Sequence, residues 1–273
     1  SGLSVLSKGL KNYIRKCPPK QHWHFDPAGV AVDTFQTNPR LIKASLVSFL
    51  QQNMPDAIEE KFLLTWKSFD ARTKEKLDGY SFDSFSEAAA FSIILSALPS
   101  HAHVHLGNSM PCRYAELLGI NKDTHNWCNR GTSGIDGISS TAVGSALVND
   151  SLHVLISGDV SFLYDRNAFF HNYPLPNLRI IVINNRGGGI FRLIEGPSRL
   201  PELKDYFETR HQRTAEFVCM ENGIAYNRIS NESELKETLE GFFEPTLTCR
   251  LLEISVDPAE NQQAYRALRD WLK

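Results

Sequence analysis

The chain has 273 residues, of which 42% are hydrophobic and 22% charged, a composition typical of globular proteins rather than disordered ones. Its 29 Lys and Arg nearly balance its 31 Asp and Glu, so it lacks the basic excess that grips a nucleic-acid backbone. Its apolar runs fall short of the roughly 20 residues of a membrane helix. Five scattered cysteines without a C-x-x-C pair suit reduced thiols. We therefore expect a cytoplasmic protein without a nucleic-acid or membrane partner.

The first 78 residues predict two short regions. The chain starts without Met and enters a helical pattern at once, as a piece cut from a longer chain would. One helix and a strand at 22–25 cannot close a core, so residues 1–38 are expected to be the end of a preceding domain. Residues 39–78 carry a helical pattern, with Pro55 beginning a second helix, and are expected to form a linker.

Residues 79–273 alternate between strand and helix patterns. This alternation predicts an α/β domain with a mainly parallel, six-stranded sheet and helices on both faces. The stretch from 184 to about 210 is expected to be irregular. The predicted strands are 102–106, 152–157, 178–183, 224–229 and 249–256, and the helices are 83–98, 111–118, 138–148, 162–172, 214–221, 232–243 and a last one that starts after Asp257.

Three common catalytic signatures are missing from the sequence. It contains neither a nucleoside-triphosphate P-loop, nor a G-x-S-x-G nucleophile elbow, nor a G-x-G-x-x-G dinucleotide fingerprint. Hydrolase and simple nicotinamide-dependent functions therefore lose their usual support.

Two polar pairs end consecutive predicted strands, Gly158-Asp159 and Asn184-Asn185. One helix joins the two strands, so they should be parallel neighbours with Asp159 and Asn185 at the same carboxyl edge. Carboxylate, carboxamide and backbone carbonyl oxygens suit Mg²⁺, and the glycines at 187–189 let backbone approach a diphosphate. Either pair alone is commonly just a turn. Together, on one βαβ unit, they favour a metal–diphosphate site.

The same segments resemble a known family. Gly158-Asp159, followed after about 25 residues by Asn184-Asn185, is similar to the cofactor motif of the thiamine-diphosphate-dependent 2-oxo acid enzymes, with Val160 where that motif usually has glycine. Within that family, the chain looks like the synthase branch of menaquinone biosynthesis. The segments that carry this resemblance jointly are 107–113, 129–137, 158–165 and 184–191.

The resemblance implies three successive domains: a pyrimidine-binding domain, a central domain and a diphosphate-binding domain. This chain would contain the end of the central domain and, in 79–273, the diphosphate-binding domain. The implied cofactors are thiamine diphosphate and Mg²⁺, and the implied reaction joins 2-oxoglutarate to isochorismate with loss of CO₂. The whole enzyme would be a homodimer or homotetramer. The activating glutamate would belong to the missing pyrimidine-binding domain, so the chain alone is expected to be inactive.

The resemblance also implies roles for single residues. Asp159 and Asn185 would bind Mg²⁺ through their side chains, and Gly187 through its carbonyl. Ile135 would support the cofactor between its rings. The substrate side would hold Ser109, Arg113, Arg130 and, from the central domain, Lys8; guanidinium groups suit the carboxylates of both substrates. The remaining cofactor-binding positions would be Gly107, Asn108, Gly158, Val160, Ser161, Gly188 and Gly189, with Ile190 and Phe191 as pocket walls.

Two other functions and one other site stay open at this point. The chain could belong to another thiamine-dependent decarboxylase or carboligase, or it could be a diphosphate-binding regulatory module without catalysis. His101, His103 and His105 alternate along one predicted strand and could bind a transition metal. Buried histidines with hydrogen-bond partners are the commoner use of such a pattern.

Overall fold

The computed structural model describes residues 5–53, 60–131, 133–194 and 196–273. Pro55, expected to begin a helix, and Thr132 of the glycine-rich segment 129–137 lie outside these ranges. The chain forms two compact units, Ser1–Ala71 and Arg72–Lys273. Among the described helices, none combines the length and apolar character needed to cross a membrane.

The first unit is small and built around two short strands. Its described elements are α1 (Lys8–Lys16), β1 (Trp23–Phe25), β2 (Arg40–Ile42), α2 (Leu46–Gln52) and the start of α3 (Glu60–Asp78). β1 and β2 pair in parallel, with Trp23 opposite Arg40. The helical prediction was therefore wrong for 40–42. This segment is extended because it completes hydrogen bonds with the 22–26 stretch, from Arg40 N to His22 O and from Asp26 N to Ile42 O.

The second unit contains a six-stranded sheet in the order β4-β3-β5-β6-β8-β7, and each of its strand pairs is parallel. The predicted six-stranded α/β fold is confirmed. The order reverses between β3 and β5, because the chain builds outward to β4 in one direction and to β6 in the other. The strands are β3 (His103–Leu106), β4 (His125–Cys128), β5 (His153–Gly158), β6 (Leu178–Asn184), β7 (Ala225–Ile229) and β8 (Arg250–Ser255).

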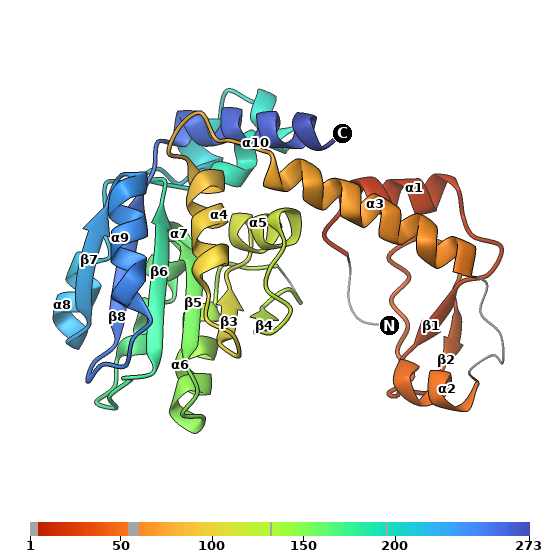
Figure 1. Cartoon of the computed structure of the whole chain (residues 1–273), viewed down its shortest axis with the longest axis horizontal. Helices are drawn as coiled ribbons and strands as arrows, with labels where there is room; N and C mark the ends of the chain where they lie inside the picture. Colours follow the sequence, from red (N-terminus) through yellow and green to blue (C-terminus); the bar gives the residue numbers. More distant parts are fainter. Residues whose placement is uncertain (1–4, 54–59, 132, 195) are drawn as a thin grey trace. The chain divides into compact units, whose positions relative to one another are not determined.

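Helices cover both faces of this sheet. Figure 1 shows α4 (Glu87–Ala97) and α9 (Glu232–Phe242) side by side on one face. On the other face, side chains of α6 (Ile138–Val148) and α8 (Glu216–Asn222) pack with β5, β6 and β8 into one buried apolar cluster. Successive strand residues point to opposite faces, so the central strands β5 and β6 are buried on both sides. The other helices of this unit are α5 (Met110–Leu118), α7 (Asp159–Tyr164) and α10 (Pro258–Leu272).

Local capping explains where several helices begin. Asn231 accepts a hydrogen bond from Glu234 N at 3.0 Å and so caps α9, while the Glu234 side chain accepts one from Ser230 N, the residue before the cap. The prediction of one helix over 162–172 was wrong. α7 starts at Asp159 and stops at Tyr164, and a separate 3-10 turn, η1 (Arg166–Phe169), follows it. Between the two, the Asp165 carboxylate accepts hydrogen bonds from Ser140 N and Oγ.

In its described residues, the segment after β6 forms short turns, as expected for an irregular region. These are the 3-10 turns η2 (Gly189–Arg192) and η3 (Pro197–Arg199) and the π turn η4 (Leu203–Phe207). They bring residues 186–213 back over the carboxyl edge of the sheet, where the predicted site lies.

Candidate functional site

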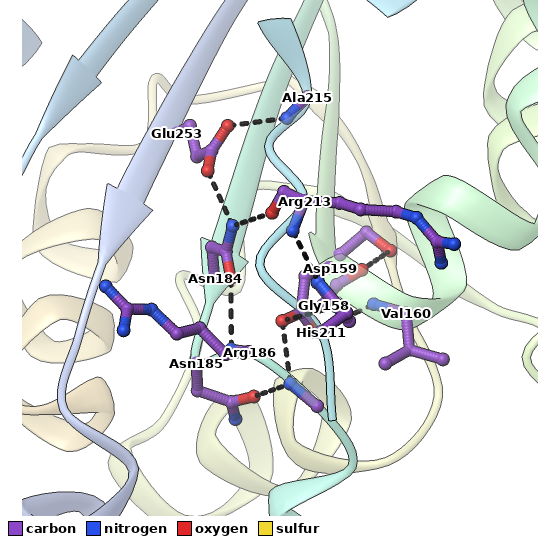
Figure 2. A network of polar contacts seen from close by, with 12 residues as sticks. Gly158, Asp159, Val160, Asn184, Asn185, Arg186, His211, Arg213, Ala215 and Glu253 are labelled. Atoms are coloured by element: carbon purple, nitrogen blue, oxygen red, sulfur yellow. Dashed lines mark hydrogen bonds and ion pairs between the residues drawn. The ribbon is translucent and has the colours of Figure 1, made fainter. Parts of the chain in front are cut away.

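The two predicted loops leave the sheet at the same level. Gly158 at the end of β5 lies opposite Ile183 of β6 in the strand register. α7 begins directly at Asp159, and the chain turns sharply after Asn184. Figure 2 shows the resulting network of polar contacts at this carboxyl edge.

Asp159 is a buried carboxylate, 3% exposed, with both oxygens facing defined partners. Oδ1 accepts a hydrogen bond from Val160 N at 2.7 Å, and Oδ2 accepts one from Gly187 N at 3.0 Å. His211 Nε2, from the segment that returns over the edge, lies 3.3 Å from the same Oδ2. The loop after β6 is thus attached directly to the start of α7.

Asn185 points into the same place from β6. Its Oδ1 accepts a hydrogen bond from Gly187 N at 3.1 Å, the same N–H that Asp159 Oδ2 contacts. Its Nδ2 donates to Glu87 at the start of α4. Two hard oxygen donors therefore meet at the backbone N–H of Gly187, a residue that also carries a carbonyl. That carbonyl accepts from Gly189 N and keeps a second lone pair.

Asn184, the preceding residue, points to the opposite face of the sheet. Its Nδ2 donates to Glu253 Oε1 at 2.6 Å and to Arg213 O at 3.0 Å, and its Oδ1 accepts from Arg186 N. Glu253 also accepts a bond from Ala215 N. The hydrogen bonds of Asn184 therefore stabilise the loop after β6. Of the two asparagines, only Asn185 faces Asp159.

The glycine run is needed for this close approach. Gly187 has φ +150°, and a Cβ there would lie 2.4 Å from the Glu208 carbonyl oxygen. A Cβ on Gly189 would lie 2.9 Å from Asn185 Nδ2. Side chains at these positions would collide with Glu208 and Asn185, so only glycine lets the loop pack this closely.

Glu208 fixes the returning segment above the glycines. Its carboxylate binds the guanidinium groups of Arg192 and Arg210, and its carbonyl accepts from Gly188 N at 2.6 Å. Burial acts to raise the pKa of Glu208, but hydrogen bonds from the two arginines outweigh it, and the pKa is lowered. The carboxylate thus stays charged and holds the segment in place.

A second set of loops forms the facing wall. Arg130 Nη1 donates to Asn108 Oδ1 at 2.6 Å, and Asn108 Nδ2 donates to the carbonyls of Ser133 and Gly134. These bonds connect the loop after β3 with the loop after β4.

Two further bonds complete that wall. Arg113 Nη1 donates to Ser109 O at 2.5 Å, within the first turns of α5. Ser161 Oγ donates to Ile135 O at 2.7 Å, which joins the loop after β4 to α7. Ser109 has φ +76°, so the backbone is strained where it enters α5.

Between these walls lies a cavity of about 550 Å³ within the second unit. The structure brings all but two of the predicted site residues to its lining. Gly107 lies behind it, donating to Ile156 O at 2.7 Å, and Lys8 is an exposed residue of the first unit. The predicted residues that line the cavity are Asn108, Ser109, Arg113, Arg130, Ile135, Gly158, Asp159, Val160, Ser161, Asn185, Gly187, Gly188, Gly189, Ile190 and Phe191.

Sequence reasoning missed several residues at this place. Tyr206, Phe207 and Thr209 line the cavity, and His211 contacts Asp159. Glu87 also lines it, and burial raises the pKa of Glu87 to about 7. Glu87 follows Ser86 at a helix start, where a glutamate ordinarily faces water, so the sequence carries no signal for its burial. The others lie in the irregular segment, whose path no periodicity predicts.

The histidine pattern has a different outcome. His101 lies in a turn with φ +66° outside β3, so the three histidines do not share a strand. His105 Nε2 lies 3.2 Å from His153 Nδ1. Within the described ranges no group of three or more His, Cys, Asp or Glu is arranged to hold a metal ion, so the transition-metal alternative gains no support.

The geometry defines a class of protein: an α/β domain whose parallel sheet carries convergent oxygen donors and a glycine run at its carboxyl edge. No family model matches the chain. Among curated relatives, the 2-succinyl-5-enolpyruvyl-6-hydroxy-3-cyclohexene-1-carboxylate synthase of Cytophaga hutchinsonii is 39% identical over 281 residues, covering 98% of this chain and 49% of the relative. The synthase of the same name from Bacteroides thetaiotaomicron is 35% identical over 272 residues, covering 99% of this chain and 48% of the relative.

A third relative of the same name, from Phocaeicola vulgatus, is 31% identical and covers the whole of this chain. The chain belongs to the family of these synthases. It spans about half the length of the curated relatives it matches.

Proposed function

We propose that the chain is the C-terminal half of a 2-succinyl-5-enolpyruvyl-6-hydroxy-3-cyclohexene-1-carboxylate synthase. In this proposal residues 1–38 end the central domain, 39–78 are the linker and 79–273 bind the cofactor's diphosphate. Support comes from the relatives' shared name and from the site at the carboxyl edge. A pyrimidine-binding domain and a cytoplasmic location belong to the same proposal.

The residues at the carboxyl edge suit Mg²⁺ and a diphosphate. Asp159, Asn185 and the Gly187 carbonyl offer three hard oxygens, and Mg²⁺ usually completes its shell with water and phosphate oxygens. The cavity of about 550 Å³ that Gly187, Gly188 and Gly189 line beside these oxygens leaves room for a diphosphate. We therefore assign thiamine diphosphate and Mg²⁺ as the cofactors.

When bound, thiamine diphosphate supplies the electron sink that lets 2-oxoglutarate lose CO₂ and form a carbon–carbon bond with isochorismate. The chain's own residues supply position and charge. Asp159 and Asn185 fix the diphosphate end through the cation. Ile135, 39% exposed in the cavity, provides an apolar support, and Ile190 and Phe191 exclude water from one wall.

Arg113 and Arg130 are proposed to hold substrate carboxylates, with Ser109 beside them. Both guanidinium groups line the cavity opposite the glycine run, and each has a donor left after its single hydrogen bond to the loop. Two cations suit two dicarboxylate substrates better than the apolar 2-oxo acids of a simple decarboxylase. Lys8, from the first unit, is assigned to the substrate side by resemblance alone.

The observation that carries the proposal is the meeting of Asp159 Oδ2 and Asn185 Oδ1 at the Gly187 N–H. Its test is calorimetry of the 273-residue chain with thiamine diphosphate, with and without Mg²⁺. Binding should require Mg²⁺, while CO₂ release from 2-oxoglutarate with isochorismate should stay at the cofactor-only background. Binding that ignores Mg²⁺ would refute the metal site, and turnover by this chain alone would refute its assignment as half of an enzyme.

A further inference from the structure

Glu87 is buried, and burying a charged carboxylate costs free energy unless hydrogen-bond partners compensate. Its side chain is 4% exposed and lies at the first residue of α4. Burying a charged or polar group without partners costs several kcal/mol, so such groups persist where they are bonded. The question is what this buried group holds.

Its backbone and its side chain face different elements. Glu87 N donates to Asn261 Oδ1 of α10 at 2.8 Å, and Ser86 caps the helix by accepting from Ala89 N. The carboxylate then accepts the Nδ2 hydrogen of Asn185. The helix start is thus fixed independently of the side chain, which is directed at the candidate metal ligand.

That contact decides which way the Asn185 carboxamide faces. An amide has an oxygen on one side and NH₂ on the other, and a half-turn exchanges them at little steric cost. In the structure a side-chain oxygen of Glu87 accepts the hydrogen of the Asn185 NH₂ group, so this side of the carboxamide is taken by its nitrogen. The Asn185 oxygen is therefore directed to the other side, toward Gly187 N and Asp159.

We propose that Glu87 is a positioning residue that keeps the oxygen of Asn185, rather than its NH₂ group, facing the cation of the metal–diphosphate site. The inference rests on the proposed function, because it concerns the same site. Outer partners of metal ligands typically change metal affinity by about 10–100-fold when removed. Glu87 would have such an effect without touching the cation.

The neighbouring asparagine shows the same device in a purely structural setting. Asn184 gives its Nδ2 to the buried Glu253 and directs its oxygen at Arg186 N. Two consecutive residues, the last of β6 and the one after it, are thus oriented by two buried glutamates, one from β8 and one from α4. Only the Asn185 pair lines the cavity.

The test compares variants of the 273-residue chain by calorimetry, with the Mg²⁺ concentration for half-saturation measured at fixed thiamine diphosphate. Glu87→Leu should raise that concentration by about 10–100-fold. Glu87→Gln keeps an acceptor for Asn185 Nδ2 but adds an NH₂ group that can pair with the Asn185 oxygen, so its half-saturating Mg²⁺ concentration should lie between those of Glu87→Leu and the unmodified chain. Ser86→Ala, the matched control, loosens the same helix start without touching Asn185 and should leave the Mg²⁺ requirement unchanged.

The outcomes separate this inference from the proposed function. If Asp159→Ala abolishes Mg²⁺-dependent binding while Glu87→Leu does not change it, only the positioning role is overturned. A Glu87→Gln variant that binds Mg²⁺ as well as the unmodified chain would also overturn it, because a group that only accepts hydrogen bonds would then not be needed to orient Asn185. If Asp159→Ala leaves binding unchanged, or the unmodified chain shows no Mg²⁺-dependent binding, the metal site itself is wrong.

Discussion

The two edges of the six-stranded sheet use polar residues in opposite ways. At the carboxyl edge, Asp159, Asn185 and Asn184 have their side-chain oxygens on backbone N–H groups. At the amino edge, His103 lies level with His125 and His153 on the neighbouring strands, with ring centroids 4.8 Å apart in each pair. One edge orients its groups through hydrogen bonds, while the other packs imidazoles against one another.

The difference is also one of charge. Within the described part of the chain, His105 Nδ1 and His153 Nε2 are buried without a hydrogen-bond partner. Burial, with the neighbouring imidazoles, lowers the pKa of His105 and of His153 to about 4. Folding therefore favours the neutral form of these two histidines. The carboxyl edge gathers oxygen donors that suit a cation, which teaches that polarity at a strand end indicates a site only when the groups converge.

The largest expected effect is at the carboxyl edge. Asp159→Ala removes the only carboxylate of the proposed metal set and should reduce Mg²⁺-dependent thiamine diphosphate binding below detection by calorimetry. Asn185→Ala should weaken binding less, because it removes a neutral ligand. The control Asp150→Ala, at an exposed residue before β5, should bind thiamine diphosphate as the unmodified chain does. Weaker binding in this control would show that losing any carboxylate has this effect, and would contradict a specific role of Asp159.

The second largest effect is expected at Arg113 and Arg130, which are proposed to hold the substrate carboxylates. In a parent protein that also contains the other half, Arg113→Ala and Arg130→Ala should each lower kcat/KM by about tenfold to a hundredfold. The reason is that a hydrogen bond to a charged group contributes about 1.5–3 kcal/mol. Cofactor affinity should be nearly unchanged in the same preparations. Lost cofactor affinity with normal kinetics would place these arginines at the diphosphate instead.

The glycine run can be probed through stability. Gly187→Ala puts a Cβ into the Glu208 carbonyl at a φ of +150°, and should lower the free energy of unfolding by about 1–3 kcal/mol. Gly144→Ala, within α6 and with nothing within 4 Å of the added Cβ, should raise it by about 0.5–1 kcal/mol. Urea denaturation of both variants measures this opposite pair of signs, and equal effects would contradict it.

A further effect, on the pH dependence of stability, is expected at the amino edge. In the unfolded chain His105 and His153 take up protons near the ordinary histidine pKa of 6.5. In the folded chain their pKa is lowered to about 4, so they stay neutral until the pH falls that far. The free energy of unfolding should therefore fall as the pH falls below 6.5, by about 1.4 kcal/mol per histidine at pH 5.5. Chemical denaturation at pH 7.5 and 5.5 measures the slope.

A matched pair of variants tests the source of that slope. The double variant His105→Leu with His153→Leu should flatten it. His125→Gln, at an exposed position, should preserve it. An unchanged slope in the double variant would assign the acid sensitivity to other groups.

The sequence predicted best those elements that carry a long run of apolar residues. β5 and β6 are mostly apolar runs, so their ends were predicted to within one residue, and with them the position of Asp159 and Asn185 at the carboxyl edge. β4 was missed because its four residues, His125–Cys128, are mostly exposed and carry no apolar run. It forms because β3 offers an open edge, a tertiary cause that local pattern does not record.

The remaining parts of the site depend on contacts far apart in the chain. Glu87 meets Asn185 across 98 positions, and His211 meets Asp159 through a segment without periodicity. The αβ alternation predicted that loops would gather at the carboxyl edge. It could not predict which side chains from α4 or from the returning segment would join them.

The reversal of strand order between β3 and β5 has a consequence for engineering the chain. It gathers the loops after β3, β4, β5 and β6 around one cavity and leaves the connections at the opposite edge free of any part in it. The connection from α9 to β8 is one of these, and its Leu247 is 92% exposed. A peptide tag or fluorescent label inserted there should be carried without disturbing the site, which would give the binding experiments a reporter far from the residues they test.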